Sequence, residues 1–492
     1  MIPYKISILA LLQIVLSPLP IHAAPLSGTK PNIILVLTDD QGMGDLSCMG
    51  NTYLKTPHLD QFYNKSTRFT DFQVSPTCAP TRSALMSGRH PFEVGVSHTV
   101  GQRERLAQGV VTFPQMLQKA GYVTGLFGKW HLGDEDAYLP QNRGFNEVLM
   151  HGAGGITQSR WGDFIPNAET KYFDSILLHN QTVVQSKGFC TDVFFDAGLA
   201  WSKKQIDSNQ PFFTYISLNA PHGPMYAPEK YKKRFLDAGF DDKAAARYAM
   251  IENVDSNFGK LMQRLSEWNA LENTLVIFMT DNGMSMPAFK VNGKQQLAFN
   301  AGMKGAKNSP HEGGTHVPSF WYWKGKTIEG ADITALTAHL DIYRTFCDLA
   351  GVKAPEGKLP PRGRSLVPLL EDPKAEWQDS KRFVHQGRWN DVWTKRTREE
   401  SKYQGCAVRT QRWRLVNNAK LYDISQDPGQ KKDIAEQYPA VVKELRQAYD
   451  QWWDTLTPLL VNEDLEWTEE GKHPFQLRHK ALGDKKLPLF RP

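Results

Sequence analysis

The 492-residue sequence is poor in cysteine, and its five cysteines lie far apart. They are Cys48, Cys78, Cys190, Cys347 and Cys406. An odd number at irregular spacing argues against a dense disulfide framework, and no cysteine–histidine cluster at zinc spacing accompanies them. The ordinary explanation for a lone cysteine is a small buried apolar side chain. Cys78 does not fit it easily, because the surrounding stretch SPTCAPTRSALMSGRH is polar and rich in proline.

Long apolar runs are absent after the N-terminus. Residues 1–23 combine one lysine, an apolar run and small residues near the end, which is the pattern of a cleaved signal peptide. We therefore expect an exported protein, periplasmic or secreted, with no membrane span. The formal net charge of +6 suits anionic substrates, and we expect no nucleic-acid partner.

Four short apolar runs predict strands that are buried on both faces of a largely parallel sheet. They cover residues 32–38, 122–127, 212–218 and 275–280. Between them, residues 113–121 and 244–268 carry apolar residues at three- and four-residue spacing, as crossover helices do. The sequence therefore predicts an α/β fold in which helices sandwich a large, mostly parallel sheet.

Polar residues follow each of these strands, where open α/β sheets place their active sites. They are Asp39, Asp40, Lys129, His131, His222, Asp281 and Asn282. Each has an ordinary alternative explanation as a helix cap, a solvated charge or a hydrogen-bonded structural histidine. Their coincidence at four strand ends of one sheet favours a functional site.

The acidic residues among them indicate a metal site. Two adjacent aspartates and an Asp-Asn pair offer only oxygen ligands, so a hard cation, Ca²⁺ or Mg²⁺, is preferred and zinc comes next. No P-loop and no paired carboxylates typical of a glycosidase are present. Basic side chains around a hard cation instead fit a tetrahedral oxyanion.

The stretch CAPTRSALMSGRH resembles the signature of the type I sulfatases, Cys-x-Pro-x-Arg followed by a small-residue helix start and Thr/Ser-Gly-Arg. Further stretches match that family in order along nearly the whole chain after residue 23: LTDDQGMGDLSCMG, TPHLDQF, FTDFQ, GKWHLG, APHGP, TDNG, KGAKNSPHEGGTHVP and LYDISQDPGQKKDIA. A bare CxPxR is a weak signal, whereas the complete ordered set is specific. The family has the alkaline-phosphatase-like fold and hydrolyses sulfate esters.

The resemblance implies that a maturation enzyme oxidises Cys78 to formylglycine. One hydroxyl of the hydrated aldehyde attacks sulfur, and the other, once deprotonated, expels sulfate. A serine accepts the sulfuryl group but cannot eliminate it.

The resemblance also assigns roles to matching positions. Asp39, Asp40, Asp281, Asn282 and an oxygen of modified Cys78 are expected to hold Ca²⁺, with Mg²⁺ as second choice. Arg82 and Lys129 are expected to steady the hydrate and a sulfate oxygen, with His131 as the base. His222 and Lys307 are expected to face the leaving oxygen. We prefer Lys307 to Lys304, because the lysine of the family lies five residues before the glutamate of EGG, here Glu312.

The composition divides the chain after the signal peptide into two parts. We expect a catalytic domain over 25–365 and, beyond a proline-rich connection, a smaller C-terminal α+β subdomain over 366–492. In the second part, CAVRTQRWRLVNN and KLYDIS predict antiparallel strands and AVVKELRQAYDQWWDTL predicts a helix packed on them. The loop at 151–163 is expected to form part of the leaving-group subsite. The stretch GRWNDVWTKR at 387–396 is expected to flank the cleft and contact a sugar plane and its sulfates.

Two alternatives remain open at this stage. Phosphatases and phosphodiesterases of the same superfamily share the sheet and an overlapping metal site, although those that use Thr or Ser lack CxPxR. A non-catalytic protein that binds sulfated glycans is the other alternative. We expect a sulfated carbohydrate as the natural substrate and aryl sulfates as artificial ones.

Overall fold

A computed structural model describes residues 25–165, 172–390 and 393–492. The predicted signal peptide over 1–23 lies outside the described residues. Among the described residues, no helix has the length and apolar content needed to cross a membrane.

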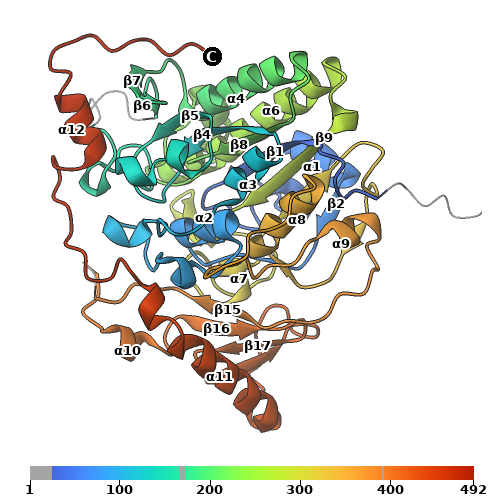
Figure 1. The fold of residues 1–492 in the computed structure, drawn as a ribbon. Coiled ribbons are helices and arrows are strands. Elements are labelled where there is room, and N and C mark those ends of the chain that lie inside the picture. The colour runs from blue at the N-terminus through green and yellow to red at the C-terminus, as the bar shows by residue number, and fades with distance from the viewer. Residues whose placement is uncertain (1–24, 166–171, 391–392) are drawn as a thin grey trace, which may run out of the picture.

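A ten-stranded mixed sheet forms the centre of the molecule (Figure 1), in the order β13-β2-β12-β9-β1-β8-β4-β5-β6-β7. Its middle five strands are parallel: β9 (Thr274–Thr280), β1 (Asn32–Thr38), β8 (Phe212–Ser217), β4 (Val123–Lys129) and β5 (Glu147–His151). The outer strands are β13 (Asp332–Ile333), β2 (Thr67–Phe69), β12 (Ser319–Tyr322), β6 (Ile176–His179) and β7 (Thr182–Gln185). Antiparallel pairing at β12 and β6 makes the sheet mixed.

Helices cover both faces of the sheet, which explains why β1 is apolar along its whole length. Ile33, Leu35 and Leu37 pack on one face, and Ile34 and Val36 pack on the other. The first face is covered by α2 (Cys78–Ser87), α3 (Phe113–Lys119), α8 (Ile342–Leu349) and α9 (Val367–Glu371). The second is covered by α1 (Pro57–Lys65), α4 (Cys190–Asp207) and α6 (Asp242–Glu267). The predicted fold class, an α/β sandwich with a smaller C-terminal unit, is confirmed.

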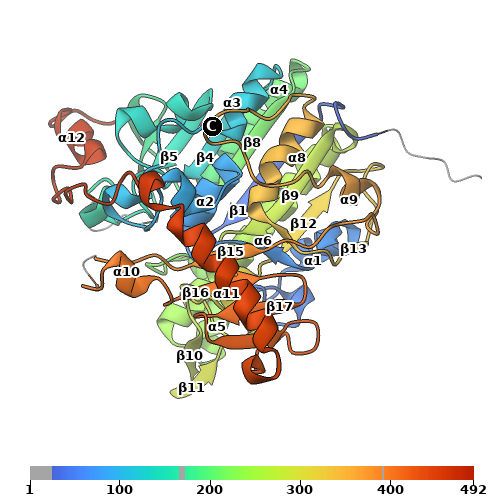
Figure 2. The ribbon, with the colours of Figure 1, turned by 60° about the horizontal axis from the view of Figure 1, so that its bottom comes forward.

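The C-terminal part forms a separate antiparallel sheet of four strands below the large one (Figures 1 and 2). It consists of β15 (Arg382–His385), β16 (Cys406–Arg409), β17 (Trp413–Val416) and β18 (Lys420–Asp423). Helix α11 (Pro439–Asp454) packs on it through Trp452 and Trp453. Shorter elements are β3 (Phe72–Gln73), β10 (Ala288–Val291), β11 (Lys294–Leu297), β14 (Thr337–Ala338), α5 (Glu229–Asp237), α7 (Glu312–Thr315), α10 (Arg398–Ser401) and α12 (Pro474–Lys480).

The predicted elements differ from the observed ones mainly at their ends. The strand predicted over 122–127 continues to Lys129 as β4, so this lysine belongs to the strand itself. CAVRTQRWRLVNN contains two strands, β16 and β17, joined by a tight turn. The short antiparallel edge strands were not predicted, because runs of two to four residues carry no clear apolar pattern.

A buried carboxylate joins the two sheets. Glu312, at the start of α7, accepts from Arg409 Nε at 2.9 Å and from the Arg414 guanidinium, and both arginines come from the small sheet. Burial opposes ionisation, but these arginines outweigh it and hold the pKa of Glu312 well below its ordinary value. Since Gly313 N–H donates to the Lys304 carbonyl at 2.8 Å, this network also holds the loop that carries Lys307.

Replacing the carboxylate tests the network. Glu312→Gln leaves two buried guanidinium groups without their shared anion, and breaking a buried pair costs about 3–5 kcal/mol. We expect a loss of that size in the free energy of unfolding measured by urea denaturation. Glu356→Gln, at an exposed glutamate, is the matched control and should change it by less than about 0.5 kcal/mol. Equal stability of the two variants would contradict the role of Glu312.

Candidate active site

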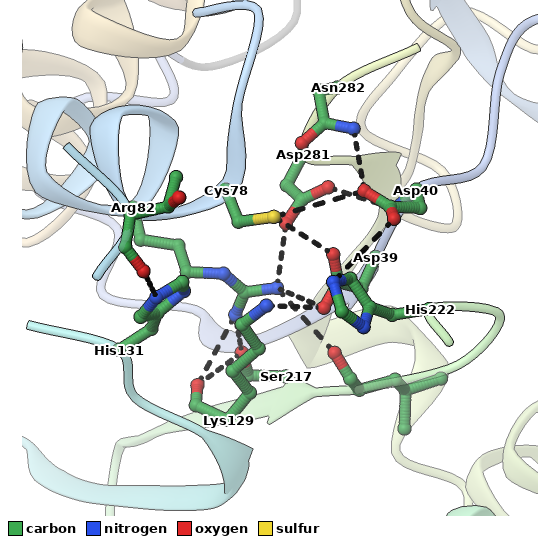
Figure 3. Close-up of polar contacts among 12 residues, drawn as sticks. Asp39, Asp40, Cys78, Arg82, Lys129, His131, Ser217, His222, Asp281 and Asn282 are labelled. Carbon is green, nitrogen blue, oxygen red and sulfur yellow. Dashed lines mark hydrogen bonds and ion pairs between the residues drawn. The ribbon is translucent and has the colours of Figure 1, made fainter. Parts of the chain in front are cut away.

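Two parallel strands bring the acidic residues together. Strands β1 and β9 are neighbours with Thr38 opposite Thr280, so Asp39 and Asp40 emerge beside Asp281 and Asn282. The Asp40 backbone N–H donates to Asp281 Oδ1 at 3.1 Å, and Asn282 Nδ2 donates to Asp40 Oδ1 at 2.9 Å. The register of one strand pair thus creates the acidic cluster shown in Figure 3.

Cys78 is the first residue of α2, and its side chain faces this cluster. The thiol lies 3.2 Å from Asp39 Oδ1 and 3.8 Å from Asp40 Oδ1, and the residue is 1% exposed. Burial and the neighbouring Asp39 raise the pKa of the Cys78 thiol. The residue encoded at this position is therefore a neutral thiol, which is a poor nucleophile compared with a thiolate.

Three basic side chains surround the carboxylates. Arg82, one turn after Cys78 on α2, donates to Asp281 Oδ2 at 2.9 Å, and the Lys129 ammonium donates to Asp39 Oδ2. Lys307 Nζ donates to Asp40 Oδ2 at 2.8 Å and lies 3.4 Å from Cys78 Sγ. Lys304 points elsewhere, with Nζ 3.5 Å from the Tyr422 hydroxyl.

The pKa values show that negative charge is only partly balanced. Burial raises the pKa of Asp40, but Lys307 and His222 outweigh it, and the net shift is downward. Burial and Asp39 raise the pKa of Asp281 to about 7, although Arg82 opposes the shift. A bound cation relieves the repulsion between carboxylates that converge on one point.

Both predicted catalytic histidines are neutral; His131 is buried and His222 is half-buried. Burial and Lys307 lower the pKa of His222 to about 3, and its Nε2 lies 3.7 Å from Asp40 Oδ2. Burial and Lys129 lower the pKa of His131 well below its ordinary value. His131 Nε2 lies 2.7 Å from the Thr99 carbonyl; among the described residues its Nδ1 has no hydrogen-bond partner.

The structure also places residues at the site that the sequence did not indicate. Ser217, the last residue of β8, accepts from Arg82 and donates to the Lys129 carbonyl at 2.7 Å. Glu104 lies buried with Oε2 3.3 Å from His131 Nε2. Ser217 ends an ordinary apolar run and Glu104 lies in a short 3₁₀ turn, so neither had a recognisable signal.

The loop over 151–163 covers the two histidines. A Cβ at Gly154 would lie 2.7 Å from His131 Cε1, and a Cβ at Gly155 would lie 3.6 Å from His222 Nδ1. The loop therefore borders the site from the side of the histidines, as expected for a segment that contacts the substrate. Its contact with the leaving group stays a prediction.

The donor atoms fit a hard divalent cation. Ligand atoms of Asp39, Asp40, Cys78 and His222 all lie within 4.8 Å of one another. Asn282 Oδ1 is buried and, among the described residues, accepts no hydrogen bond, which is the state expected of an oxygen reserved for a metal ion. Most of these donors are oxygens, which Ca²⁺ and Mg²⁺ prefer.

Comparison with known proteins agrees with this chemistry. A family model described as "Sulfatase" matches residues 31–352. The chain belongs to the sulfatase family. The C-terminal part of the chain, residues 306–453, matches a second model, "N-sulphoglucosamine sulphohydrolase, C-terminal". The predicted family and the predicted enzyme class, a sulfuric ester hydrolase, are confirmed.

Individual sulfatases resemble most of the chain. Human arylsulfatase A is 32% identical over 69% of this chain and 68% of its own length. Mouse N-acetylgalactosamine-6-sulfatase is 27% identical over 76% of this chain and 72% of its own length. The crystal structure of Ps i-CgsB in complex with k-i-k-neocarrahexaose superposes with a TM-score of 0.75 at 26% identity, covering 92% of this chain and 98% of that one.

Cation binding can be measured without turnover. A divalent cation at a concentration 100 times its Kd should stabilise the metal-free sulfatase by about 2.7 kcal/mol, seen as a rise in Tm. Asp40→Asn should abolish most of that rise, because it removes a charged ligand. Asp237→Asn, at an exposed position of α5, is the control and should keep it. A full rise in the Asp40→Asn protein would show that the cation binds elsewhere.

Proposed function

We propose that this sulfatase releases sulfate from sulfated carbohydrates through a formylglycine made from Cys78. The observation that carries the proposal is the position of Cys78, which lies between the carboxylates of Asp39 and Asp40 and the ammonium of Lys307. A buried neutral thiol there has little use as a nucleophile. A hydrated aldehyde at residue 78 supplies one hydroxyl to accept the sulfuryl group and a second whose deprotonation releases sulfate.

Lys307 and His222 differ in how readily they donate a proton to the leaving oxygen. His222 Nδ1 lies 2.6 Å from the Gly223 carbonyl and donates to it, so neutral His222 has no proton on Nε2. Burial opposes the charge on Lys307, but Asp40 raises its pKa above the ordinary value, and the lysine carries its proton at rest. Lys307 is therefore the resident donor to the leaving oxygen, and His222 assists once protonated.

His131 is suited to accept the proton of the second hydroxyl. Its Nε2–H donates to the Thr99 carbonyl, which leaves Nδ1 as the basic atom, and no described residue hydrogen-bonds to Nδ1. Arg82 and Lys129 pair with Asp281 and Asp39 and hold positive charge next to the reacting group, where sulfate oxygens need donors.

We assign the metal site to Ca²⁺, with Mg²⁺ second. Asp39, Asp40, Asp281, Asn282 and an oxygen on modified residue 78 would hold the ion, which supplies Lewis-acid stabilisation of negative charge. Several carboxylates converging from two loops suit the larger coordination number of Ca²⁺ better than the strict octahedron of Mg²⁺.

A carbohydrate substrate is supported by relatives and by charge. A mouse relative is named for a sulfated amino sugar, and the structurally similar Ps i-CgsB was solved with an oligosaccharide. The net charge of +6 favours anionic chains. We further propose that the protein is exported after cleavage of a signal peptide at residues 1–23 and that a maturation enzyme modifies Cys78 after translation.

Mass spectrometry tests the modification directly. Protein produced together with a formylglycine-generating enzyme should give a Cys78 peptide about 18 Da lighter than the thiol form. It should release sulfate from an aryl sulfate and from sulfated saccharides. Cys78→Ser should keep its fold and Tm but lose turnover by at least about 10³-fold, because the second hydroxyl is missing.

Two results would contradict the sulfatase mechanism, and a third would contradict the carbohydrate substrate. Unmodified Cys78 protein that matches the rate of modified protein would show that the thiol suffices. Faster release of phosphate than of sulfate from the same aryl leaving group would indicate a phosphatase. Sulfate release confined to aryl esters, with none from any saccharide, would remove the carbohydrate assignment alone.

Metal identity is tested by removal and replacement. Chelation of the modified enzyme should abolish sulfate release, and Ca²⁺ should restore it more fully than Mg²⁺ at equal concentration. Full activity after verified removal of metal would show that the assigned ligands have another function. Recovery with zinc but not with calcium would show that the site prefers a softer ion.

A further inference from the structure

Three tryptophans from distant parts of the chain meet beside the site. Trp161 lies 5.7 Å from Trp393 and 5.8 Å from Trp467 between ring centroids. His98 stacks on Trp393 at 5.4 Å with an interplanar angle of 9°. Trp393 is 58% exposed, while Trp161 and Trp467 are half-buried. We refer to Trp161, Trp393, Trp467 and His98 as the tryptophan platform.

The platform only partly matches the sequence prediction for 387–396. Trp389, which was expected to contact the substrate, is 2% exposed and packs in the core of the C-terminal part, so that expectation was wrong. Its neighbour Trp393 points outward instead. Residues 391 and 392 of the same stretch lie outside the described residues.

Partly buried polar contacts fix the segments that carry the platform. Arg103 donates to the carbonyls of Asn390 and Glu463, each at 3.2 Å. The Glu463 carboxylate accepts from Ser97 and from Trp389 Nε1. In Figure 1 the red chain after α11 and the orange stretch before α10 both lie at the left edge of the molecule. A surface held in place in this way loses little conformational entropy when a ligand binds.

The platform borders the catalytic site on its histidine side. His98 directly precedes Thr99, whose carbonyl holds His131 at 2.7 Å. Trp161 belongs to the loop whose Gly154 approaches His131. Gly155 of the same loop approaches His222, with 3.6 Å between an added Cβ and His222 Nδ1. A chain bound with its sulfate at Cys78 and its leaving oxygen near Lys307 and His222 therefore lies beside the loop that leads to the platform.

Charge near the platform favours an anionic sugar chain. The Arg160 guanidinium lies 5.0 Å from the Trp161 ring centroid, and that of Arg388 lies 5.5 Å from the Trp393 centroid. A hollow of about 490 Å³ next to Trp467 is lined by Arg103 and Lys395 but also by Glu463, Asp464 and Glu466. Since Arg103 pairs with Glu463, sulfate groups are expected at Arg160 and Arg388 instead of in this hollow.

We propose that the tryptophan platform binds a second sugar residue of the substrate chain, on the leaving-group side of the sulfated residue that reacts. The inference rests on the proposed carbohydrate substrate. Aromatic rings bind the apolar faces of sugars by stacking, and the adjacent guanidinium groups bind sulfate. The enzyme would then prefer oligosaccharides to single sulfated sugars.

Kinetics with substrates of different length test the platform. Trp393→Ala should raise KM for a sulfated hexasaccharide about tenfold, because an exposed aromatic anchor is lost, with kcat nearly unchanged. KM for an aryl sulfate or a sulfated monosaccharide should not change, since neither reaches the platform. Trp393→Phe should restore most of the affinity for the hexasaccharide.

The matched control is Trp413→Ala. Trp413 lies in the small sheet, and the Arg412 guanidinium is 4.2 Å from its ring centroid. These two residues form a Trp–Arg pair similar to Trp393 and Arg388, but outside the platform. The loss of Trp413 should leave KM unchanged for all substrates. An equal rise in KM for long and short substrates in Trp393→Ala, or no rise for either, would overturn the proposal.

Direct binding separates this inference from the proposed function. Titration calorimetry on Cys78→Ala protein, with a panel of sulfated hexasaccharides that includes neocarrahexaose, should show Kd about tenfold weaker after Trp393→Ala. Absence of aryl sulfate turnover would refute the catalytic proposal without affecting this measurement. Failure of every hexasaccharide to bind, or identical Kd values for the two proteins, would refute the platform.

Discussion

The accumulation of buried carboxylates is the constraint on which the rest of the site depends. Asp39, Asp40 and Asp281 are fully enclosed, and such charges are tolerated only when cations and donors compensate them. Arg82, Lys129 and Lys307 supply that compensation from a helix, a strand and a loop. The raised pKa of Asp281 shows that compensation is incomplete, and a divalent cation would complete it.

The small C-terminal sheet contributes to the site from a distance. Its Arg409 and Arg414 surround Glu312, which starts the helix after the loop carrying Lys307. The same part of the chain brings Trp393 and Trp467 next to Trp161. The C-terminal part thus holds one basic group of the site and carries two residues of the proposed tryptophan platform, so its packing bears on function.

Several features were predictable because local rules govern them. The apolar run at 32–38 matches β1 without any shift of its ends, since a strand enclosed on both faces needs apolar residues throughout. The closeness of Asp39 and Asp281 was predictable, because parallel strands place their carboxyl ends, where active sites lie, at the same edge of the sheet. Trp389 was misjudged because a tryptophan in an irregular stretch gives no sign of which side it faces. Glu104 and Ser217 were missed because single polar residues carry no periodic pattern.

The sequence by itself determined the fold class, the family and the residues around Cys78, because strand patterns and short motifs are properties of neighbouring residues. Only the tertiary structure decided which distant groups meet. Arg409 contacts Glu312 across 97 positions of sequence, and Trp161, Trp393 and Trp467 come from three separate segments. Such contacts depend on strand register and on how two sheets pack together, and neither is encoded in the spacing of any local motif.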